Sequence, residues 1–269
     1  MAKGKLLFIG LGLYNEKDIS LNGFSKIAQC DVLFAEFYTS ELIGLKKNSL
    51  KQTFGKNVKI LTREETEKGD SIIEHAKHHV VGFLTGGDPM IATTHIDLRI
   101  RAMKLGIETE VIHSSSIITA APGMLGLQNY KFGRTTTLAF PEKNYFPTSP
   151  YTVIYENKKL GLHTLVLLDI QQDQNRYMTA NQAISLLLKM EQKHQKKLFS
   201  EDSIGCVIAR AGAPTSIIAA DSFQALSKMD FGEPLHTIVI PGKLHFMEVE
   251  ALQTLAGLPS SLALKLQKV

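Results

Sequence analysis

The sequence contains no tryptophan and only two cysteines, Cys30 and Cys206, which lie far apart along the chain. Two distant cysteines exclude a cysteine-rich zinc site and argue against a disulfide framework, so the expected environment is a reducing cytoplasm. Because tryptophan is absent and only seven tyrosines are present, no stretch of interleaved aromatic and basic residues is available to stack exposed bases. These absences disfavour a nucleic-acid-binding protein.

The sequence also has no large excess of charge of one sign and no long apolar run. The chain has 30 Lys and Arg against 26 Asp and Glu, a formal net charge of +4, and its basic residues are scattered. Such dispersion is typical of a solvated surface and not of a nucleic-acid groove. No apolar run reaches the roughly 18 residues of a membrane span. The short run from Leu6 to Leu13 carries two glycines and lacks a cleavage site, which predicts a strand and not a signal segment.

Several motifs of catalysis are missing. The histidines form no His-Glu-x-x-His pair, so no metal site is expected. Neither a Gly-x-Ser-x-Gly elbow nor a Gly-x-x-x-x-Gly-Lys-Ser/Thr loop occurs, which weakens hydrolase and nucleotidase interpretations. Gly10-x-Gly12 follows the first apolar run, but Asn15 stands where the dinucleotide fingerprint requires its third glycine. A nicotinamide or flavin site is therefore disfavoured.

The composition and rhythm that are present indicate an α/β protein. Hydrophobic residues make up 44% of the 269 residues and charged residues 21%, which is ordinary for a globular chain, and the length favours two domains. In the first half, short apolar runs alternate with stretches of helical spacing. Continuously apolar runs are typical of a parallel sheet that is covered on both faces. The predicted strands are Lys5–Leu11, Asp31–Phe37, Val58–Leu61, Val80–Thr85 and Glu108–His113.

The rhythm changes after His113, where a run of three serines is followed by Ala121-Pro122-Gly123. We therefore predict an N-terminal α/β domain with a mostly parallel sheet over residues 1–113 and a C-terminal α/β domain over residues 114–269. The second domain begins near a Thr-rich run, residues 134–140. Its predicted strands are Thr164–Ile170, Ile204–Ala209, Ser216–Ala220 and His236–Ile240.

Two helices carry clear signals at their ends. In the first domain, Thr94-x-x-Asp97 resembles a capping pair and Gly106 is suited to a left-handed C-terminal residue, while three apolar residues share one face, namely Ile96, Ile100 and Met103. In the second domain, Thr179-x-x-Gln182 predicts a capping box for a helix over residues 180–193. Its side chains at spacings of three or four are Ile184, Leu187, Leu188 and Glu191. The polar tail, residues 191–197, is expected to be solvated helix surface.

Two glycine loops follow predicted strands at the sheet edge where ligands of open α/β folds bind. Gly10-Leu11-Gly12-Leu13 follows the first strand, and Leu84-Thr85-Gly86-Gly87-Asp88-Pro89 follows the fourth. Glycines expose main-chain groups, and Asp88 adds a carboxylate. A plain turn would use the same residues, so a structural interpretation and a ligand-binding one are both open on this pattern alone.

Many segments in order resemble the tetrapyrrole-methylase superfamily, and within it the branch that methylates translation elongation factor 2. The segments that carry the resemblance run nearly from end to end: residues 8–13, 36–40 (Glu-Phe-Tyr-Thr-Ser), 87–89 (Gly-Asp-Pro), 92–95, 111–113 with 116–117, 130–133, 146–149, 163–165, 168–170, 177–183, 209–212 (Ala-Arg-Ala-Gly) and 241–245.

The resemblance implies a class III methyltransferase with two α/β domains and a cleft between them that holds S-adenosyl-L-methionine. It implies trimethylation of the amino group on a 3-amino-3-carboxypropyl-modified histidine of elongation factor 2 to give diphthine, a step of diphthamide biosynthesis. It also implies a homodimer in the cytoplasm. Carried over by position, the cofactor contacts are Leu13, Asp88, Ile91, Ser116, Ile117, Leu168, Ala211 and His236.

This chain departs from the pattern of the resemblance at three places. Gly86 stands where a proline is frequent, Tyr145 stands where a tryptophan is frequent, and one additional residue falls near Pro122. We expect the first change to loosen the cofactor loop. The compact stretch from Leu168 to Tyr177 resembles the shorter archaeal form, which stops at the trimethylated amine.

No residue is assigned as the proton acceptor. Aromatic faces attract quaternary ammonium by roughly 0.5 to 2 kcal/mol each, so we expect Tyr38, Tyr145 or Phe146 to flank the methylated amine, although for any single one of them plain packing is the better explanation. Two rival interpretations are a methylase of a corrin or porphyrin precursor and a non-catalytic protein that binds elongation factor 2. Methyl transfer to the purified substrates distinguishes them.

Overall fold

The computed structural model describes residues 4–38, 40–45, 49–142 and 145–267 of the protein. The chain forms two compact units, residues 1–117 and 118–269, whereas the sequence places the boundary between residues 113 and 114. The serine run belongs to the first unit because the Ser114 main-chain N–H donates to the Asp88 carboxylate at 3.2 Å. Thr39, part of one segment that carries the resemblance, lies outside the described residues.

The first unit contains a five-stranded sheet with the order β3-β2-β4-β1-β5, in which every neighbouring pair is parallel. All five predicted strands are confirmed, and their ends differ from the prediction by at most one residue. The strands are β1 (Lys5–Gly10), β2 (Val32–Glu36), β3 (Val58–Ile60), β4 (Val80–Thr85) and β5 (Glu108–Ile112).

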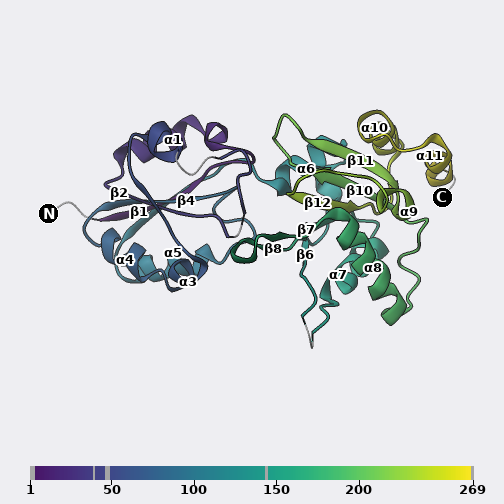
Figure 1. Ribbon diagram of the computed structural model, residues 1–269, viewed down its shortest axis with the longest axis horizontal. Helices are drawn as coiled ribbons and strands as arrows, with labels where there is room; N and C mark the ends of the chain where they lie inside the picture. The colour runs from purple at the N-terminus through teal and green to yellow at the C-terminus, as the bar shows by residue number, and fades with distance from the viewer. Residues whose placement is uncertain (1–3, 39, 46–48, 143–144, 268–269) are drawn as a thin grey trace. The chain divides into compact units, whose positions relative to one another are not determined.

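Helices cover both faces of this sheet (Figure 1). Along β1, Leu7 and Ile9 pack with α1 (Leu21–Gln29) and α2 (Ser49–Phe54), while Leu6 and Phe8 pack with α4 (Asp70–Ala76) and α5 (His95–Lys104). Because both faces of the strand are buried, apolar residues are required at successive positions, which is why the run is apolar without alternation. The short helix α3 (Arg63–Lys68) lies on the side of α4 and α5.

Helix α5 forms where it is predicted, but the predicted capping pair is wrong, and the apolar face noted in the sequence is not the buried one. Thr94 is the N-cap residue, yet its side chain makes no capping hydrogen bond. The face shared by Ile96, Ile100 and Met103 is exposed, with 52%, 44% and 57% of each residue accessible. The buried positions of α5 are instead His95, Leu98 and Ala102. The helix therefore has two sets of residues at helical spacing, and the set that contains Leu98 and Ala102 is the one that packs on the sheet.

The second unit contains a mixed five-stranded sheet with the order β11-β10-β12-β7-β6, in which only β6 and β7 are parallel. Its strands are β6 (Thr136–Leu138), β7 (Thr164–Leu168), β10 (Ile204–Ala209), β11 (Ile217–Ser222) and β12 (His236–Ile240). The predicted strand Thr164–Ile170 is interrupted at Asp169, whose carboxylate accepts the Phe140 main-chain N–H at 2.9 Å. The remainder forms a small hairpin, β8 (Ile170–Gln171) with β9 (Arg176–Tyr177).

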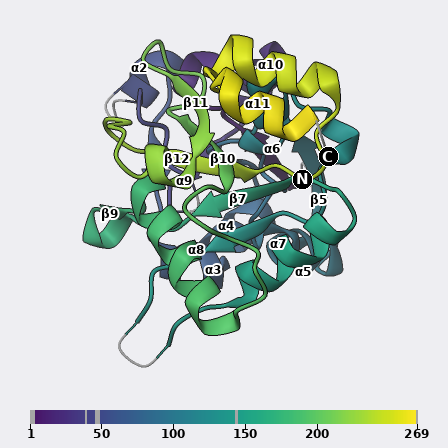
Figure 2. The ribbon, with the colours of Figure 1, turned by 90° about the vertical axis from the view of Figure 1, so that its right-hand side faces the viewer.

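Helices lie on both sides of the second sheet (Figure 2). Helices α7 (Ser149–Lys159) and α8 (Ala180–His194) lie on one side, where α9 (Phe223–Leu226) joins the same apolar cluster. Helices α10 (Phe246–Ala256) and α11 (Ser260–Gln267) lie on the other side. Helix α6 is Ile117–Leu125, and the 3-10 helices are Glu16–Asp18, Asn129–Lys131 and Gln172–Gln174. Within the described ranges, no helix combines the length and apolar character that a membrane span needs.

The predicted capping box of α8 is confirmed, because the Thr179 side chain accepts from the Gln182 N–H and the Gln182 side chain accepts from the Thr179 N–H. The prediction for the tail of this helix, residues 191–197, is confirmed for its exposed residues but is wrong for Glu191. Helix α8 ends at His194, and the Glu191 carboxylate accepts the Tyr151 hydroxyl at 2.7 Å and three main-chain N–H groups from residues 197–199. Glu191 therefore anchors the chain as it leaves the helix and is not a freely solvated side chain.

A buried ionic network closes the edge of the second sheet at which β7 begins. Glu248 is 1% exposed, and its carboxylate accepts hydrogen bonds from the Lys131 ammonium and from His163 Nε2 at 3.0 Å. The His163 Nδ1 accepts the Gly242 N–H at 3.0 Å, which makes Nε2 the protonated nitrogen. Burial alone would raise the pKa of Glu248, but donors from the His245 and Gln128 main chain, from Lys131 and from His163 outweigh it and lower the pKa to about 2.

This network predicts a specific sensitivity to acid. A carboxyl whose folded-state pKa lies below its ordinary value of 4.5 contributes stability above pH 4.5, and this contribution is lost as the pH falls from 4.5 towards 2. We expect Glu248→Gln to reduce the free energy of unfolding at pH 7 by about 2 kcal/mol, because charged hydrogen bonds become neutral ones. Urea unfolding from pH 7 to pH 2.5 checks this, and the gap between the two proteins is expected to narrow in acid. Parallel pH curves would contradict the assignment.

Candidate active site

The two glycine loops of the first unit pair with each other. Gly12 and Gly87 exchange main-chain hydrogen bonds, with the Gly87 N–H donating to the Gly12 carbonyl at 2.7 Å and the Gly12 N–H donating to the Gly87 carbonyl at 3.3 Å. Both residues have positive φ, 87° for Gly12 and 70° for Gly87, a region that other residues rarely adopt. The pairing extends the contact between β1 and β4 beyond their carboxyl ends.

Gly10 allows this close approach. A Cβ atom at position 10 would lie 2.5 Å from the Gly87 carbonyl oxygen, 2.7 Å from the Ser114 Cβ and 3.0 Å from the Pro89 Cδ. Any side chain would therefore push apart the loops that follow β1, β4 and β5. Gly86 is packed closely as well, because a Cβ there would lie 2.6 Å from the Ser40 carbonyl oxygen.

Asp88 ties the loop after β4 to the loop after β5. Its Oδ1 accepts the Met90 N–H at 3.0 Å, and its Oδ2 contacts His113 Nδ1 at 2.7 Å and accepts the Ser114 N–H at 3.2 Å. The Asp88 side chain is 8% exposed and that of His113 is 74% exposed. A carboxylate has about four acceptor positions, so this one is largely occupied by donors from its own chain. Asp88 is a predicted site residue, whereas its partner His113, which directly follows β5, is not among the predicted contacts.

Five of the predicted cofactor contacts lie in these loops or, for Ile117, at the first residue of α6. Leu13 follows β1, Asp88 and Ile91 follow β4, and Ser116 and Ile117 follow β5. Strand β1 lies between β4 and β5, so their carboxyl ends are neighbours at one edge of the sheet. Ser116 is 4% exposed and Ile91 is 38% exposed. The structure therefore brings these residues together as the sequence positions implied, and their contact with a cofactor stays a prediction.

The three predicted contacts of the second unit also share one sheet edge. Leu168 ends β7 and Ala211 follows β10, while His236 begins β12, which is antiparallel to both. Ala209 lies opposite His236, and Leu167 lies opposite Thr237. Leu168 and His236 are more than 60 positions apart in sequence, and strand pairing brings them to the same end of the sheet.

His236 is held by both of its ring nitrogens. Nδ1 accepts the Ala180 N–H at 3.1 Å, so Nε2 carries the proton and donates to the Glu233 carbonyl at 3.2 Å. Burial and the nearby Arg210 cation both lower the pKa of His236, with burial the larger cause. The imidazole is therefore neutral and engaged within the protein. Neither ring nitrogen is therefore free to hydrogen-bond a cofactor.

His95 is buried and holds the loop after β4 through a hydrogen bond. It is 2% exposed, its Nδ1 donates to the Pro89 carbonyl at 2.9 Å, and its ring meets Phe83 edge to face. Its Nε2 lies 3.5 Å from a carboxylate oxygen of the fully buried Glu36. Burial lowers the pKa of His95, while the bond to Pro89 acts in the opposite direction. His95 has no predicted role, although it lies in a segment that carries the resemblance.

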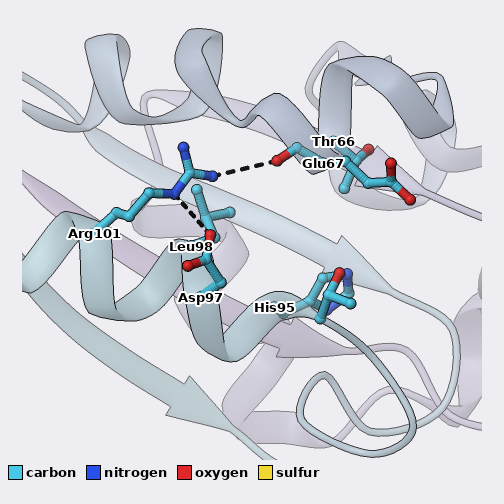
Figure 3. A pocket seen from close by; sticks show the side chains of 7 residues that line it. Thr66, Glu67, His95, Asp97, Leu98 and Arg101 are labelled. Carbon is cyan, nitrogen blue, oxygen red and sulfur yellow. Dashed lines mark hydrogen bonds and ion pairs between the residues drawn. The ribbon is translucent and has the colours of Figure 1, made fainter.

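A pocket of about 260 Å³ opens between α3 and α5 (Figure 3). His95 and Thr94 line one part of it, and Arg101 lines another, where its guanidinium donates to the Lys68 carbonyl at 2.6 Å and pairs with Asp97 at 2.9 Å. The remaining lining residues are Thr66, Glu67 and Leu98. The predicted cofactor contacts are not among these residues, so this pocket is not the predicted site.

The three candidate aromatic residues differ in their surroundings. The Arg63 guanidinium lies 5.8 Å from the ring centre of Tyr38, and the Lys193 ammonium lies 4.1 Å from that of Phe146. Tyr145 is 62% exposed and pairs through its main chain with Glu142. In the part of the chain that the structure describes, no three His, Cys, Asp or Glu side chains gather as a metal-binding group.

Known proteins with similar sequences define the family. The sequence profile of the Tetrapyrrole (Corrin/Porphyrin) Methylases matches residues 5–226. The chain is 50% identical over 254 residues to the diphthine synthase of Methanothermobacter thermautotrophicus, an alignment that covers 94% of this chain and 96% of that protein. It is 47% identical over 253 residues to the diphthine synthase of Methanocaldococcus jannaschii, with 93% and 98% covered.

The fold agrees with this assignment. The structure superposes on a crystal structure of diphthine synthase with a TM-score of 0.88 and 36% sequence identity, covering 96% of this chain and 98% of that chain. Similarity at this level extends through both units, and the α/β architecture expected from the sequence is confirmed. The chain therefore belongs to the tetrapyrrole methylase family, a family of methyltransferases, and within it to the diphthine synthases.

Proposed function

We propose that the protein uses S-adenosyl-L-methionine to trimethylate the amino group of a 3-amino-3-carboxypropyl-modified histidine in translation elongation factor 2, giving diphthine. The observation that carries this proposal is the near full-length identity of 45 to 50% with proteins named diphthine synthase. Elongation factor 2 is thus the protein substrate, and a homodimer in the cytoplasm is the form we expect to act on it.

The residues that would hold the cofactor are Leu13, Asp88, Ile91, Ser116, Ile117, Leu168, Ala211 and His236. They fit such a ligand because they offer main-chain groups beside glycines with positive φ, together with apolar side chains such as Leu13 and Ile91. When bound, S-adenosyl-L-methionine supplies a methyl group that is already activated on a positively charged sulfur. The chain then needs to position the amine and exclude water, and a covalent nucleophile is unnecessary.

The aromatic residues provide a test of how methylation is completed. A methylated ammonium would have to compete with Arg63 at Tyr38 and with Lys193 at Phe146, whereas Tyr145 is largely exposed. We expect Tyr145→Leu to raise the share of mono- and dimethylated product about threefold, as loss of one cation–π contact of about 0.6 kcal/mol would do, and Tyr38→Leu to have less effect. Mass spectrometry of the product measures this.

Tyr130→Leu, at a tyrosine that is 80% exposed, is the control. If neither Tyr145→Leu nor Tyr38→Leu alters the ratio, the aromatic hypothesis is wrong.

The proposed function is tested by incubating the purified chain with labelled S-adenosyl-L-methionine and elongation factor 2 that carries the unmethylated modified histidine. We expect label in the factor and a mass gain of three methyl groups. Label that enters only a corrin or porphyrin precursor would support the rival methylase. Binding of the factor without any label would support a non-catalytic partner. Light scattering on the same sample measures whether the chain is a dimer.

A further inference from the structure

The second unit contains a buried arginine whose cation faces main-chain oxygens. Arg210 directly follows β10 and is 9% exposed. Its Nη2 donates to the Thr215 carbonyl at 2.8 Å, and its Nε donates to the same carbonyl at 3.1 Å and to the Thr215 hydroxyl at 3.2 Å. Its Nη1 donates to the Phe231 carbonyl at 2.5 Å and to the Glu233 carbonyl. No carboxylate is among these acceptors. The carbonyl groups of two loops, together with the Thr215 hydroxyl, hold the side chain in place.

These contacts join the two loops at the edge that carries the predicted cofactor contacts. Thr215 belongs to the turn that begins with Ala211, and Glu233 belongs to the turn that leads into His236. The Glu233 carbonyl accepts from Arg210 and also from His236 Nε2. One guanidinium therefore connects the main chain before His236 to the main chain after Ala211.

The backbone supplies independent support. Arg210 has a φ of 51°, in the left-handed region, and a residue other than glycine in that conformation costs on the order of 1 kcal/mol or more. Strain of this kind persists where surrounding contacts impose it, and it is concentrated at functional sites. Here it reverses the chain immediately before Ala211. The Arg210 N–H also donates to the Leu235 carbonyl at 2.7 Å, which attaches the reversal to the start of β12.

We infer that Arg210 is a positioning residue for cofactor binding: its guanidinium sets the main chain of Ala211 and His236 in the geometry that holds S-adenosyl-L-methionine. This inference rests on the proposed function. Arg210 itself touches neither the methyl group nor the amine. Its effect is on affinity for the cofactor and not on the rate of transfer once the cofactor is bound.

Substitution of Arg210 by lysine separates charge from geometry. Arg210→Lys keeps the positive charge, but a single ammonium does not reach three carbonyls at once. We expect the Kd for S-adenosyl-L-homocysteine, measured by calorimetry, to rise at least tenfold. The KM for S-adenosyl-L-methionine is expected to rise in parallel, while kcat at saturating cofactor stays within about twofold. In the cofactor-free protein, amide exchange at residues 211–216 and 231–235 is expected to accelerate.

Two glycines provide a matched pair for the case in which Arg210→Lys fails to fold. Gly232 has φ 69°, and a Cβ there would lie 3.2 Å from Arg210 Nη1, whereas Gly257 has φ 70° and has no atom within 4 Å of its added Cβ. Alanine imposes the same backbone strain at both positions, but only Gly232→Ala presses on the guanidinium. We expect Gly232→Ala to weaken binding of S-adenosyl-L-homocysteine by about threefold to tenfold and Gly257→Ala to leave it unchanged.

The outcomes are distinct. Wild-type affinity in Arg210→Lys, or equal affinities in the two glycine variants, would overturn the inference and leave Arg210 as a stabilising residue only. Glu248→Gln, at the opposite edge of the same sheet, is the stability control and is expected to bind the product normally. If the wild-type protein itself binds neither S-adenosyl-L-methionine nor S-adenosyl-L-homocysteine, the proposed function fails, and not this inference alone.

Discussion

Asp88→Ala is expected to weaken binding of S-adenosyl-L-homocysteine by about a hundredfold. The carboxylate accepts hydrogen bonds from the Met90 and Ser114 main chains and contacts His113, and its removal releases the loops after β4 and β5 from each other. Hydrogen bonds to a charged group are worth roughly 1.5 to 3 kcal/mol each, and tenfold in affinity corresponds to about 1.4 kcal/mol. Without these hydrogen bonds, the loops no longer hold the predicted contacts Ile91 and Ser116 in position. Calorimetry with the purified protein measures the effect.

Asp31→Ala is the matched control for this experiment. Asp31 precedes β2, at the opposite edge of the same sheet, and its carboxylate accepts the Val80 N–H at 2.8 Å. It thus performs the same structural task away from the glycine loops. We expect Asp31→Ala to leave the affinity unchanged, and Asp88→Asn to fall between alanine and the wild type. An Asp88→Ala protein with wild-type affinity would remove this carboxylate from the site.

Gly10→Ala is expected to destabilise the protein by about 3 kcal/mol and to abolish detectable cofactor binding. The added Cβ would lie 2.5 Å from the Gly87 carbonyl oxygen, which is main chain and does not move away by a rotamer change. Overpacking of this kind costs typically 1 to 3 kcal/mol, and a contact with backbone belongs at the upper end of that range. The loops must separate, which also breaks the paired hydrogen bonds of Gly12 and Gly87. Urea unfolding and calorimetry measure the two effects.

Gly123→Ala serves as the control for that substitution. Gly123 lies within α6, and no atom lies within 4 Å of an added Cβ. Alanine favours a helix over glycine by up to about 1 kcal/mol, so this variant is expected to be as stable as the wild type or slightly more so. A Gly10→Ala protein that unfolds at the wild-type urea concentration would show that the glycine loops yield easily, and the proposed rigid site would then be wrong.

The sequence predicted much of the local structure, because the signals involved are local. Both ends of the strand Val80–Thr85 are confirmed, because a short apolar run is recognised from its own residues. The capping box of Thr179 and Gln182 was predicted for the same reason, because its donors and acceptors lie three residues apart. The glycine loops were recognised, and their placement at the carboxyl ends of neighbouring strands followed from a parallel sheet.

Other features depend on partners that are far away in sequence. The prediction for α5 identified a stripe of apolar residues, but the sheet buries His95 and Leu98 and leaves Ile96 exposed. The polar residues of the α8 tail predict solvated surface, yet the Glu191 carboxylate accepts a hydrogen bond from a tyrosine 40 residues away. The structure divides the chain after Ile117, four residues beyond the predicted boundary, because the Asp88 carboxylate accepts the main-chain N–H of Ser114, 26 residues further along the chain.

By itself, the sequence determined an α/β chain with glycine loops after its first and fourth strands, because periodicity and capping depend on neighbouring residues. Its resemblance to a known family indicated a methyltransferase. Only the tertiary structure decided that Gly12 pairs with Gly87, that Asp88 joins two loops, and that a buried Arg210 connects the turns beside Ala211 and His236. The physical reason is that a hydrogen bond or a close contact depends on distances of about 3 Å, and the meeting of such distant groups is set by how strands pair and helices pack.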